Sequence, residues 1–129
     1  MTDSYPPFQY RLEPREGYLF VEVSGKMRDR EDMLRYQRDL EGALVPELGK
    51  RLMVDGRGAE RPLPELRAAM WTWMSEAPCV ARIAILAIED KTTRRVKRSA
   101  EEMRIRIVPF HDEAEAEAWL LAGVAASQA

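Results

Sequence analysis

The sequence predicts an α/β fold, in which a mostly parallel sheet of four or five strands carries helices packed on it. Two observations lead to this prediction. Segments with the two-residue alternation of strands are separated by segments with the 3.6-residue spacing of helices, in the expected order β-β-α-β-α-β-α-β-α. The first two strands are close enough for an antiparallel hairpin, whereas each later strand follows a helix, which favours parallel pairing.

The chain opens with the expected hairpin. Residues 8–13 alternate apolar and polar side chains, as a strand with one buried face does. Pro14 and Gly17 mark the turn that follows. Residues 18–25 are apolar on both faces, which indicates a strand in the centre of the sheet.

The first helix is expected to begin after Asp29, an acceptor side chain suited to the N-cap position. The apolar positions that recur at helical spacing are Met33, Tyr36 or Gln37, Leu40 and Leu44. We expect the helix to reach about Leu48, to be strained near Pro46 and to stop at Gly49.

The middle of the chain continues the alternation of strands and helices. Residues 51–55 are expected to form a short buried strand, and residues 63–77 a helix with Pro64 in its first turn. Residues 80–88 are the most strongly apolar segment and predict the clearest strand of the chain.

The last third of the chain completes the pattern. A third helix is expected to begin at Asp90 or Thr92, and a last strand to lie within residues 103–110. Asp112, followed by an acidic residue three positions later, resembles a capping box at the start of a final helix over residues 113–123. The terminal residues are expected to fray.

Composition limits the classes of function. The 129 residues fit one domain, 1–129, with its core at about 8–123, and 46% hydrophobic with 33% charged residues indicates a soluble globular chain. Net charge is −2, which gives no overall reason to expect nucleic acid. There is no secretion-signal pattern and no run long enough to span a membrane, so we expect a cytoplasmic protein. One cysteine and one histidine exclude an internal disulfide and a Cys/His zinc site within one chain, and no cofactor is expected.

Three stretches carry a family resemblance. These are VEVSGK at 21–26, VDGRG at 54–58, and a closing pattern made of Phe110, Asp112, Ala116, Trp119 and Leu120. With them, over roughly residues 8–121, the chain resembles the SpoIIAA-like proteins of the STAS superfamily, bacterial domains related to the anti-sigma-factor antagonists. The resemblance implies this α/β fold and a non-enzymatic regulatory or protein-interaction module.

The resemblance also shows where this chain departs from the regulatory proteins. Those regulators carry a phosphorylatable serine or threonine just after the strand that ends in Asp, and the added phosphate charge breaks a contact with a partner. The corresponding stretch here, GRGAERPLPEL, has no Ser or Thr between Asp55 and Thr72. The kinase-switched mechanism is therefore not carried over to this chain.

Asp55 and Arg57 are the first candidates for a ligand or partner surface. An Asp at a strand end most often caps a turn or the next helix by accepting backbone hydrogen bonds. A phosphate-binding role is the weaker interpretation, because GRG lacks the third glycine of a dinucleotide fingerprint and the Lys-Ser/Thr of a P-loop.

The helix at 63–77 carries more apolar surface than one buried stripe requires. Met70 lies on the expected core stripe, whereas Trp71 lies about 100° away, on the side of Met74. In the structural interpretation Trp71 lies flat on the surface or is covered by a neighbouring element. In the functional one it contributes to a dimer interface, a lipid-facing patch or the gate of a pocket. Both alternatives remain open, and Met70, Trp71 and Met74 are candidate binding residues.

A basic cluster follows in the third expected helix. Its members are Arg94, Arg95, Lys97 and Arg98. Such a cluster is ordinarily a solvated helix face, and it could also attract anionic headgroups or an acidic partner.

Three hypotheses of function follow. The first is a non-enzymatic STAS-like module that binds an unknown protein partner or forms a homodimer. The second is a SpoIIAA-like carrier or sensor of an apolar small molecule, or a membrane-associating domain, that uses the 63–77 helix. An enzyme comes third, because no carboxylate pair, triad, metal cluster or cofactor motif is evident.

Overall fold

The computed structural model describes residues 7–44, 51–60, 63–76, 82–87, 94–95, 97–98 and 107–128, with side chains in the helices described as far as 74 and 122. The strands are β1 (Gln9–Arg15), β2 (Tyr18–Gly25), β3 (Arg51–Ala59), β4 (Arg82–Leu86) and β5 (Ile107–Phe110). The helices are α1 (Arg30–Ala43), α2 (Pro64–Glu76) and α4 (Glu113–Gln128), and residues 94–95 and 97–98 are also helical.

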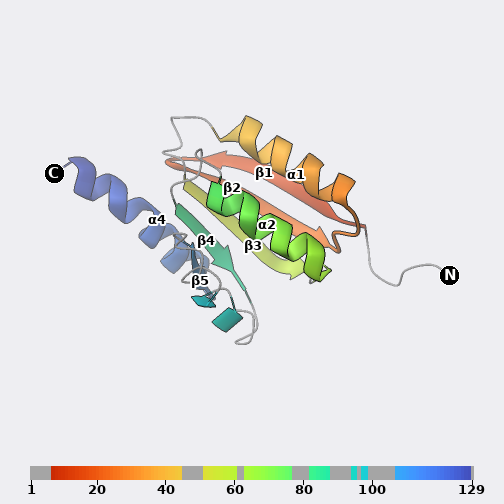
Figure 1. The fold of residues 1–129 in the computed structure, drawn as a ribbon. Helices are drawn as coiled ribbons and strands as arrows, with labels where there is room; N and C mark the ends of the chain where they lie inside the picture. Colours follow the sequence, from red (N-terminus) through yellow and green to blue (C-terminus); the bar gives the residue numbers. More distant parts are fainter. Residues whose placement is uncertain are drawn as a thin grey trace.

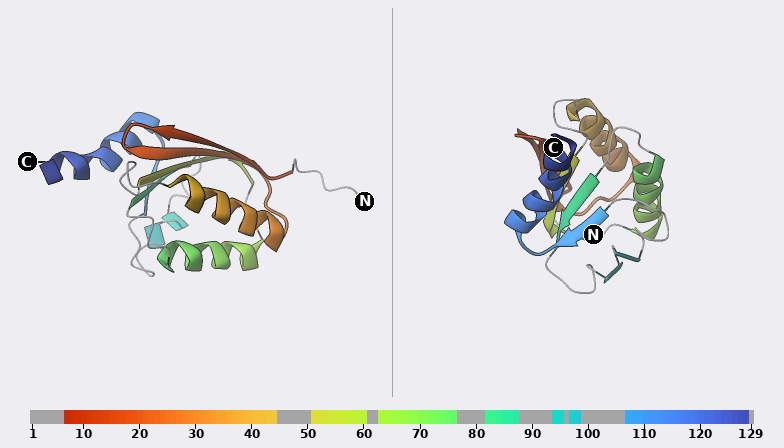
Figure 2. Two further views of the ribbon diagram at one scale, coloured as in Figure 1. Left: turned by 90° about the horizontal axis from the view of Figure 1, so that it is seen from above. Right: turned by 90° about the vertical axis from the view of Figure 1, so that its left-hand side faces the viewer.

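The strands form one five-stranded sheet in the order β1-β2-β3-β4-β5 (Figure 1). β1 and β2 are antiparallel and the remaining pairs are parallel, which confirms the predicted mixed α/β fold. Because each parallel connection moves to the next strand in the same direction, right-handed crossovers place their helices on one face of the sheet. Figure 2 shows α1, α2 and the helical residues 94–95 and 97–98 on that face and α4 on the other.

Each face of the sheet has its own apolar core. The α1–α2 face contains the larger cluster, made chiefly of Leu19, Val21, Met33, Tyr36, Leu40, Leu52 and Ile83. The α4 face contains Tyr18, Phe20, Met53, Ala84, Leu86, Ala116 and Leu120. β2 supplies both clusters with side chains, so the prediction that residues 18–25 form a central strand is confirmed.

The hairpin turn is tighter than the sequence predicts. Pro14 is part of β1, opposite Leu19, and the turn consists of Glu16 and Gly17 alone. The expectation that Pro14 belongs to the turn is therefore wrong, because proline is tolerated in an edge strand, where one side of the backbone has no partner strand. Gly17 has a φ of +86°, which favours glycine at this position.

The start of α1 agrees with the prediction and its end does not. The backbone N–H of Asp32 donates to Oδ1 of Asp29 over 2.9 Å, so Asp29 is the N-cap. The helix ends at Ala43, and Leu44 is extended, with φ −80° and ψ 94°. The helix therefore stops before Pro46, whose ring and missing N–H would disrupt the last turn, and residues 45–50 lie outside the described part of the chain.

β3 is longer than the predicted segment 51–55. The residues between Asp55 and Gly58 continue the strand, because Gly58 and Ala59 pair with the end of β2. The register shifts between Glu22 and Ser24, so β3 has one more residue than β2 at this point, as in a β-bulge. The stretch VDGRG is thus part of a strand, and the expectation of a loop after Asp55 is wrong.

The second half of the chain keeps the predicted order where it is described. β4 and β5 lie within the predicted strands, and α2 covers most of the predicted 63–77 helix. The predicted start of the third helix at Asp90 or Thr92 and the first residues of the last strand lie outside the described residues. α4 continues beyond the predicted end at 123 to Gln128, and alanine in this last part favours a helix.

Candidate functional site

Asp55 and Arg57 form a bidentate ion pair within β3. Nε of Arg57 donates to Oδ1 of Asp55 and Nη2 donates to Oδ2, each over 2.9 Å. The backbone N–H of Arg57 also donates to Oδ1, over 3.1 Å. The side chain of Asp55 is 10% exposed and that of Arg57 is 41% exposed. The anion of the pair is therefore nearly buried, and the cation is accessible to solvent.

This pairing fixes the charge of Asp55. The Arg57 side-chain hydrogen bonds lower the pKa of the Asp55 carboxyl, and burial opposes them to a smaller extent. Asp55 is therefore a carboxylate whose oxygens already accept hydrogen bonds, which makes it a poor proton donor. Asp55 accepts a backbone hydrogen bond from the residue two positions later, as the local structural interpretation expects, and it also pairs with the side chain of Arg57 on the same strand.

The ion pair lies on the α4 face, next to charges that join β1 to α4. Nη1 of Arg15 donates to Glu113 over 3.0 Å, and its guanidinium carbon lies 3.9 Å from the centroid of the Phe20 ring. The Tyr18 hydroxyl donates to a carboxylate oxygen of Glu117. The negative charge of Glu113 also contributes to raising the pKa of Arg57, so Arg57 lies on the same side of the sheet as Glu113.

On the opposite face of the sheet, one side of α2 is joined to α1. The amide nitrogen Nε2 of Gln37 lies 3.4 Å from the sulfur of Met70, and Nε1 of Trp73 donates to Glu41 over 2.8 Å. Leu66 is the one α2 side chain that is buried among the described ones. Met70 is therefore a contact between two helices, as its place on the core stripe predicts.

The other side of α2 carries Trp71. Helical spacing places Trp71 about 100° from Met70 and on the side of Met74, turned away from α1. Both side chains are half-buried and pack against the larger core cluster. Trp71 is thus neither fully covered nor free on the surface, and the sequence left this point open.

Two residues on the α1–α2 face of the sheet were not predicted as site residues. Val54 and Ile85 are neighbours on β3 and β4, and both are half-buried although their strands have partners on each side. In the sequence each is an ordinary apolar residue of a buried strand, so no local signal distinguishes them from Leu52 and Ile83, which are each 1% exposed.

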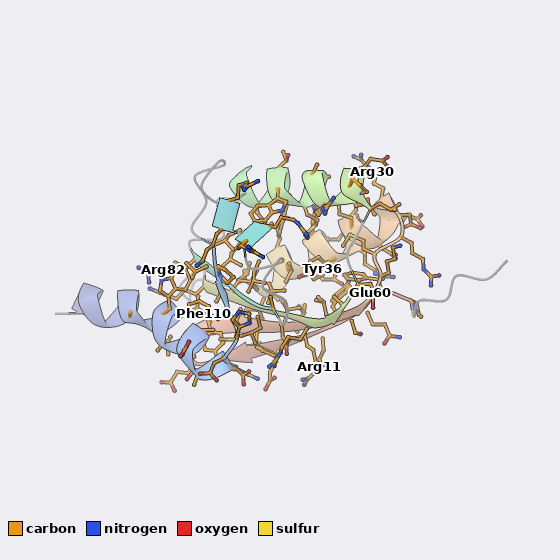
Figure 3. All side chains as sticks on the ribbon, turned by 90° about the horizontal axis from the view of Figure 1, so that it is seen from below. Arg11, Arg30, Tyr36, Glu60, Arg82 and Phe110 are labelled. Atoms are coloured by element: carbon orange, nitrogen blue, oxygen red, sulfur yellow. The ribbon has the colours of Figure 1, made fainter. Side chains whose placement is uncertain are left out.

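Two large apolar side chains are exposed at one end of the α1–α2 layer. Leu34 is 40% exposed and Leu63 is 44% exposed. The contacts of Met70 and Trp73 with α1 show that the two helices run in the same direction, so both leucines lie toward the ends where the helices begin. Figure 3 shows Arg30, the first residue of α1, beside that end of α2.

The basic cluster is exposed but separate from these groups in the sequence. Arg94, Lys97 and Arg98 are exposed and Arg95 is half-buried. They lie on the same side of the sheet as α1 and α2 (Figure 2). Nothing in the described contacts joins them to Trp71 or to Asp55.

The sheet therefore divides the predicted site residues into two groups. Asp55 and Arg57 face α4, whereas Met70, Trp71 and Met74 lie over the opposite face. The predicted candidates do not form one site, because successive side chains of a strand point to opposite faces and α2 covers one of them.

Comparison with solved structures shows what this architecture resembles. The chain is similar to an uncharacterised protein of the DUF3478 family with a SpoIIAA-like fold from Shewanella loihica PV-4, with a TM-score of 0.68 and 16% identity over 93% of this chain and 98% of that chain. The chain has a SpoIIAA-like fold. A second similar structure is an anti-sigma factor antagonist from Mycobacterium paratuberculosis, with a TM-score of 0.57 and 17% identity over 88% of this chain and 94% of that chain.

At these identities the likeness concerns the SpoIIAA-like fold and not a shared activity. No protein-family model and no curated protein matches the sequence. Among the helices of the described residues, none is long and apolar enough to cross a membrane. The described side chains also contain no group of three His, Cys, Asp or Glu residues arranged to hold a metal ion.

Proposed function

We propose that this single-domain chain is a non-enzymatic regulatory or protein-interaction module of the STAS type, which works in the cytoplasm without a phosphorylated hydroxyl between β3 and α2. The SpoIIAA-like fold supports the proposal, since one similar structure is an anti-sigma factor antagonist. The first hydroxyl after Asp55 is that of Thr72, and it donates to the carbonyl of Ala68 in the preceding turn of α2 over 3.1 Å.

The observation that carries the proposal is the pair of exposed leucines, Leu34 and Leu63. Large apolar side chains exposed near one another are typical of protein–protein contacts when polar residues surround them. Arg30 and Glu60 supply such polar groups, and Figure 3 shows both at the end of the molecule where α1 and α2 begin. We call Leu34, Leu63 and these two charged residues the docking surface.

The polar groups of the fold favour binding over catalysis. Gln37 and Asp55 are the buried polar side chains of the described residues. Gln37 contacts the sulfur of Met70, and Asp55 is held by Arg57. Neither group has the free acceptor or donor that general acid–base catalysis needs within reach of a substrate.

The partner is a protein or a second copy of this chain. The basic residues at 94–98 supply a second contact, for acidic groups on that partner, because a cluster of exposed cations attracts anions over a Debye length. This contact is expected to weaken with salt, whereas the apolar contact at the docking surface is not.

The docking surface is tested by replacing its apolar side chains with charged ones. Leu34→Arg and Leu63→Arg place charges where the partner's apolar groups would pack, and Ala118→Arg adds the same charge to an exposed position of α4 on the other face. Size-exclusion chromatography with light scattering detects a homodimer. Affinity purification of the tagged protein from its own cells detects a heterologous partner. Loss of the complex in both leucine variants and its retention in Ala118→Arg supports the proposal; equal recovery in all three contradicts it.

A further inference from the structure

The edge of the sheet at β1 is open. β1 is the outermost strand, and within the described part of the chain it pairs only with β2. Figure 2 shows β1 along the outer edge of the sheet, with α1 on one side and α4 on the other. An open edge strand can accept a further strand through its backbone. The opposite edge is less suitable, because β5 is four residues long and contains Pro109.

The hairpin determines which backbone groups of β1 point outward. Its turn has two residues, so Arg15 and Tyr18 form a hydrogen-bonded pair, and such pairs alternate along the ladder from there. Tyr10, Leu12 and Pro14 therefore turn their backbone groups away from β2. Pro14 agrees with this alternation, since proline has no N–H to donate to β2.

Helices on both sides hold β1 in place. The Tyr10 hydroxyl donates to a carboxylate oxygen of Asp39 in α1, and Nη1 of Arg15 donates to Glu113 in α4 over 3.0 Å. The edge is therefore formed before a further strand binds to it. This order lowers the conformational entropy that is lost on binding.

We propose that β1 pairs antiparallel with β1 of a second copy of this chain, about a two-fold axis at Leu12. In this register Leu12 exchanges both backbone hydrogen bonds with Leu12 of the second copy, and the N–H of Tyr10 donates to the carbonyl of Pro14 of the second copy. Each copy has one such edge, so the pairing closes into a dimer. This contact is separate from the docking surface and does not depend on the proposed function.

The charges of β1 select a second copy in this register. Arg11 and Glu13 lie on the same face of β1, and their side chains are 63% and 44% exposed. With Leu12 on the axis, Arg11 of each copy lies opposite Glu13 of the other, in a non-hydrogen-bonded pair, where side chains are closest. Moving the axis to Arg11 or to Glu13 would place that residue opposite its own copy, and like charges directly opposite one another are destabilising.

The test is a pair of charge reversals, followed by sedimentation velocity at low salt and high protein concentration, because the contact is small and partly ionic. The native protein is expected to form a dimer. Arg11→Glu and Glu13→Arg each place like charges opposite one another and are expected to weaken dimerisation at least about tenfold. An equimolar mixture of the two variants is expected to restore the dimer, because the two introduced charges then face each other and native Glu13 faces native Arg11. Arg38→Glu, an exposed change on α1, is the matched control and is expected to dimerise as the native protein does.

Hydrogen exchange followed by NMR tests the backbone contact. The amide of Leu12 is expected to exchange slowly in the native dimer and faster in Arg11→Glu. The amide of Glu13 faces β2 and is expected to keep its protection in both proteins, so it serves as an internal control.

The β1 dimer and the docking surface can fail independently. Leu34→Arg is expected to keep the β1 dimer, and Arg11→Glu, in which this dimer is weakened, serves as the background for testing the docking surface. The β1 proposal is overturned by a native protein that stays monomeric, by a dimer of native strength in either folded charge variant, or by a mixture that associates no better than its components. A Leu12 amide that exchanges equally fast in the native protein and in Arg11→Glu also overturns it.

Discussion

Arg57 holds the carboxylate of Asp55 through two side-chain hydrogen bonds of 2.9 Å and one backbone hydrogen bond, all within a single strand. Side chains two positions apart on a strand point to the same face, and the bulge between β2 and β3 places one extra residue of β3 between Asp55 and Gly58. The pair therefore stabilises an irregular strand end, and its first measurable effect is on stability.

Asp55→Asn is expected to lower the free energy of unfolding by about 1–2 kcal/mol, since it replaces charge-assisted hydrogen bonds by neutral ones while the guanidinium stays partly solvated. Urea denaturation at neutral pH measures the change. The matched control is Arg11→Gln, which removes two more exposed ion pairs, to Glu13 at 3.8 Å and to Glu22 at 3.9 Å, and is expected to cost less than about 0.5 kcal/mol. Lost binding in Asp55→Asn at unchanged stability would instead make Asp55 a binding residue.

The same ion pair predicts a pH dependence. Arg57 lowers the pKa of the Asp55 carboxyl in the folded protein, so the unfolded chain takes up the proton first as the pH falls. The stabilisation is complete above the unfolded pKa of about 3.9 and is lost as the pH falls through the folded pKa. Denaturation curves of native protein and Asp55→Asn are expected to converge below about pH 4; a gap that does not change with pH would contradict this assignment.

The N-cap of α1 gives a second prediction. Asp29→Ala removes the acceptor of the Asp32 N–H and is expected to destabilise the fold by about 1 kcal/mol. Asp29→Asn keeps a capping oxygen and is expected to change stability little, which separates the hydrogen bond from the charge. Thermal unfolding followed by circular dichroism distinguishes the two, and equal losses in both variants would count against the cap.

Two glycines are expected to respond in opposite directions to the same substitution. Gly17→Ala forces a side chain onto a residue with φ +86° and places its Cβ 2.8 Å from Cδ2 of Leu121, so we expect a loss of about 1 kcal/mol or more. Gly42→Ala meets no atom within 4 Å in α1 and is expected to add up to about 1 kcal/mol by improving helix propensity. A shift of the same sign in both denaturation midpoints would contradict these expectations.

Part of the fold could be predicted because local patterns determine it. The two apolar faces of Tyr18–Gly25 indicate a central strand, and Asp29 identifies the start of α1, as the structure confirms. The end of β3 could not be predicted, because Asp55-Gly56-Arg57-Gly58 looks like a loop until β2 supplies a pairing partner and a bulge. Tertiary pairing outweighs local propensity there.

The candidate site was harder to predict than the fold. Asp55 and Met70 are 15 positions apart and lie on opposite faces of the sheet, which alternation within β3 alone does not reveal. Val54 and Ile85 carry no sequence signal, because their partial exposure depends on tertiary packing over this face of the sheet. Leu63 is the first residue of the predicted 63–77 helix, yet it precedes α2 and is 44% exposed.

The central claim is that this chain binds a protein through the docking surface. The most direct measurement places a photoreactive benzoylphenylalanine at Leu63 and, in a matched variant, at Ala118, and then illuminates the cells that produce each protein. The account predicts a discrete cross-linked product, to a partner protein or to a second copy, from position 63 and none from position 118. No product at 63, or the same product from both positions, would contradict it.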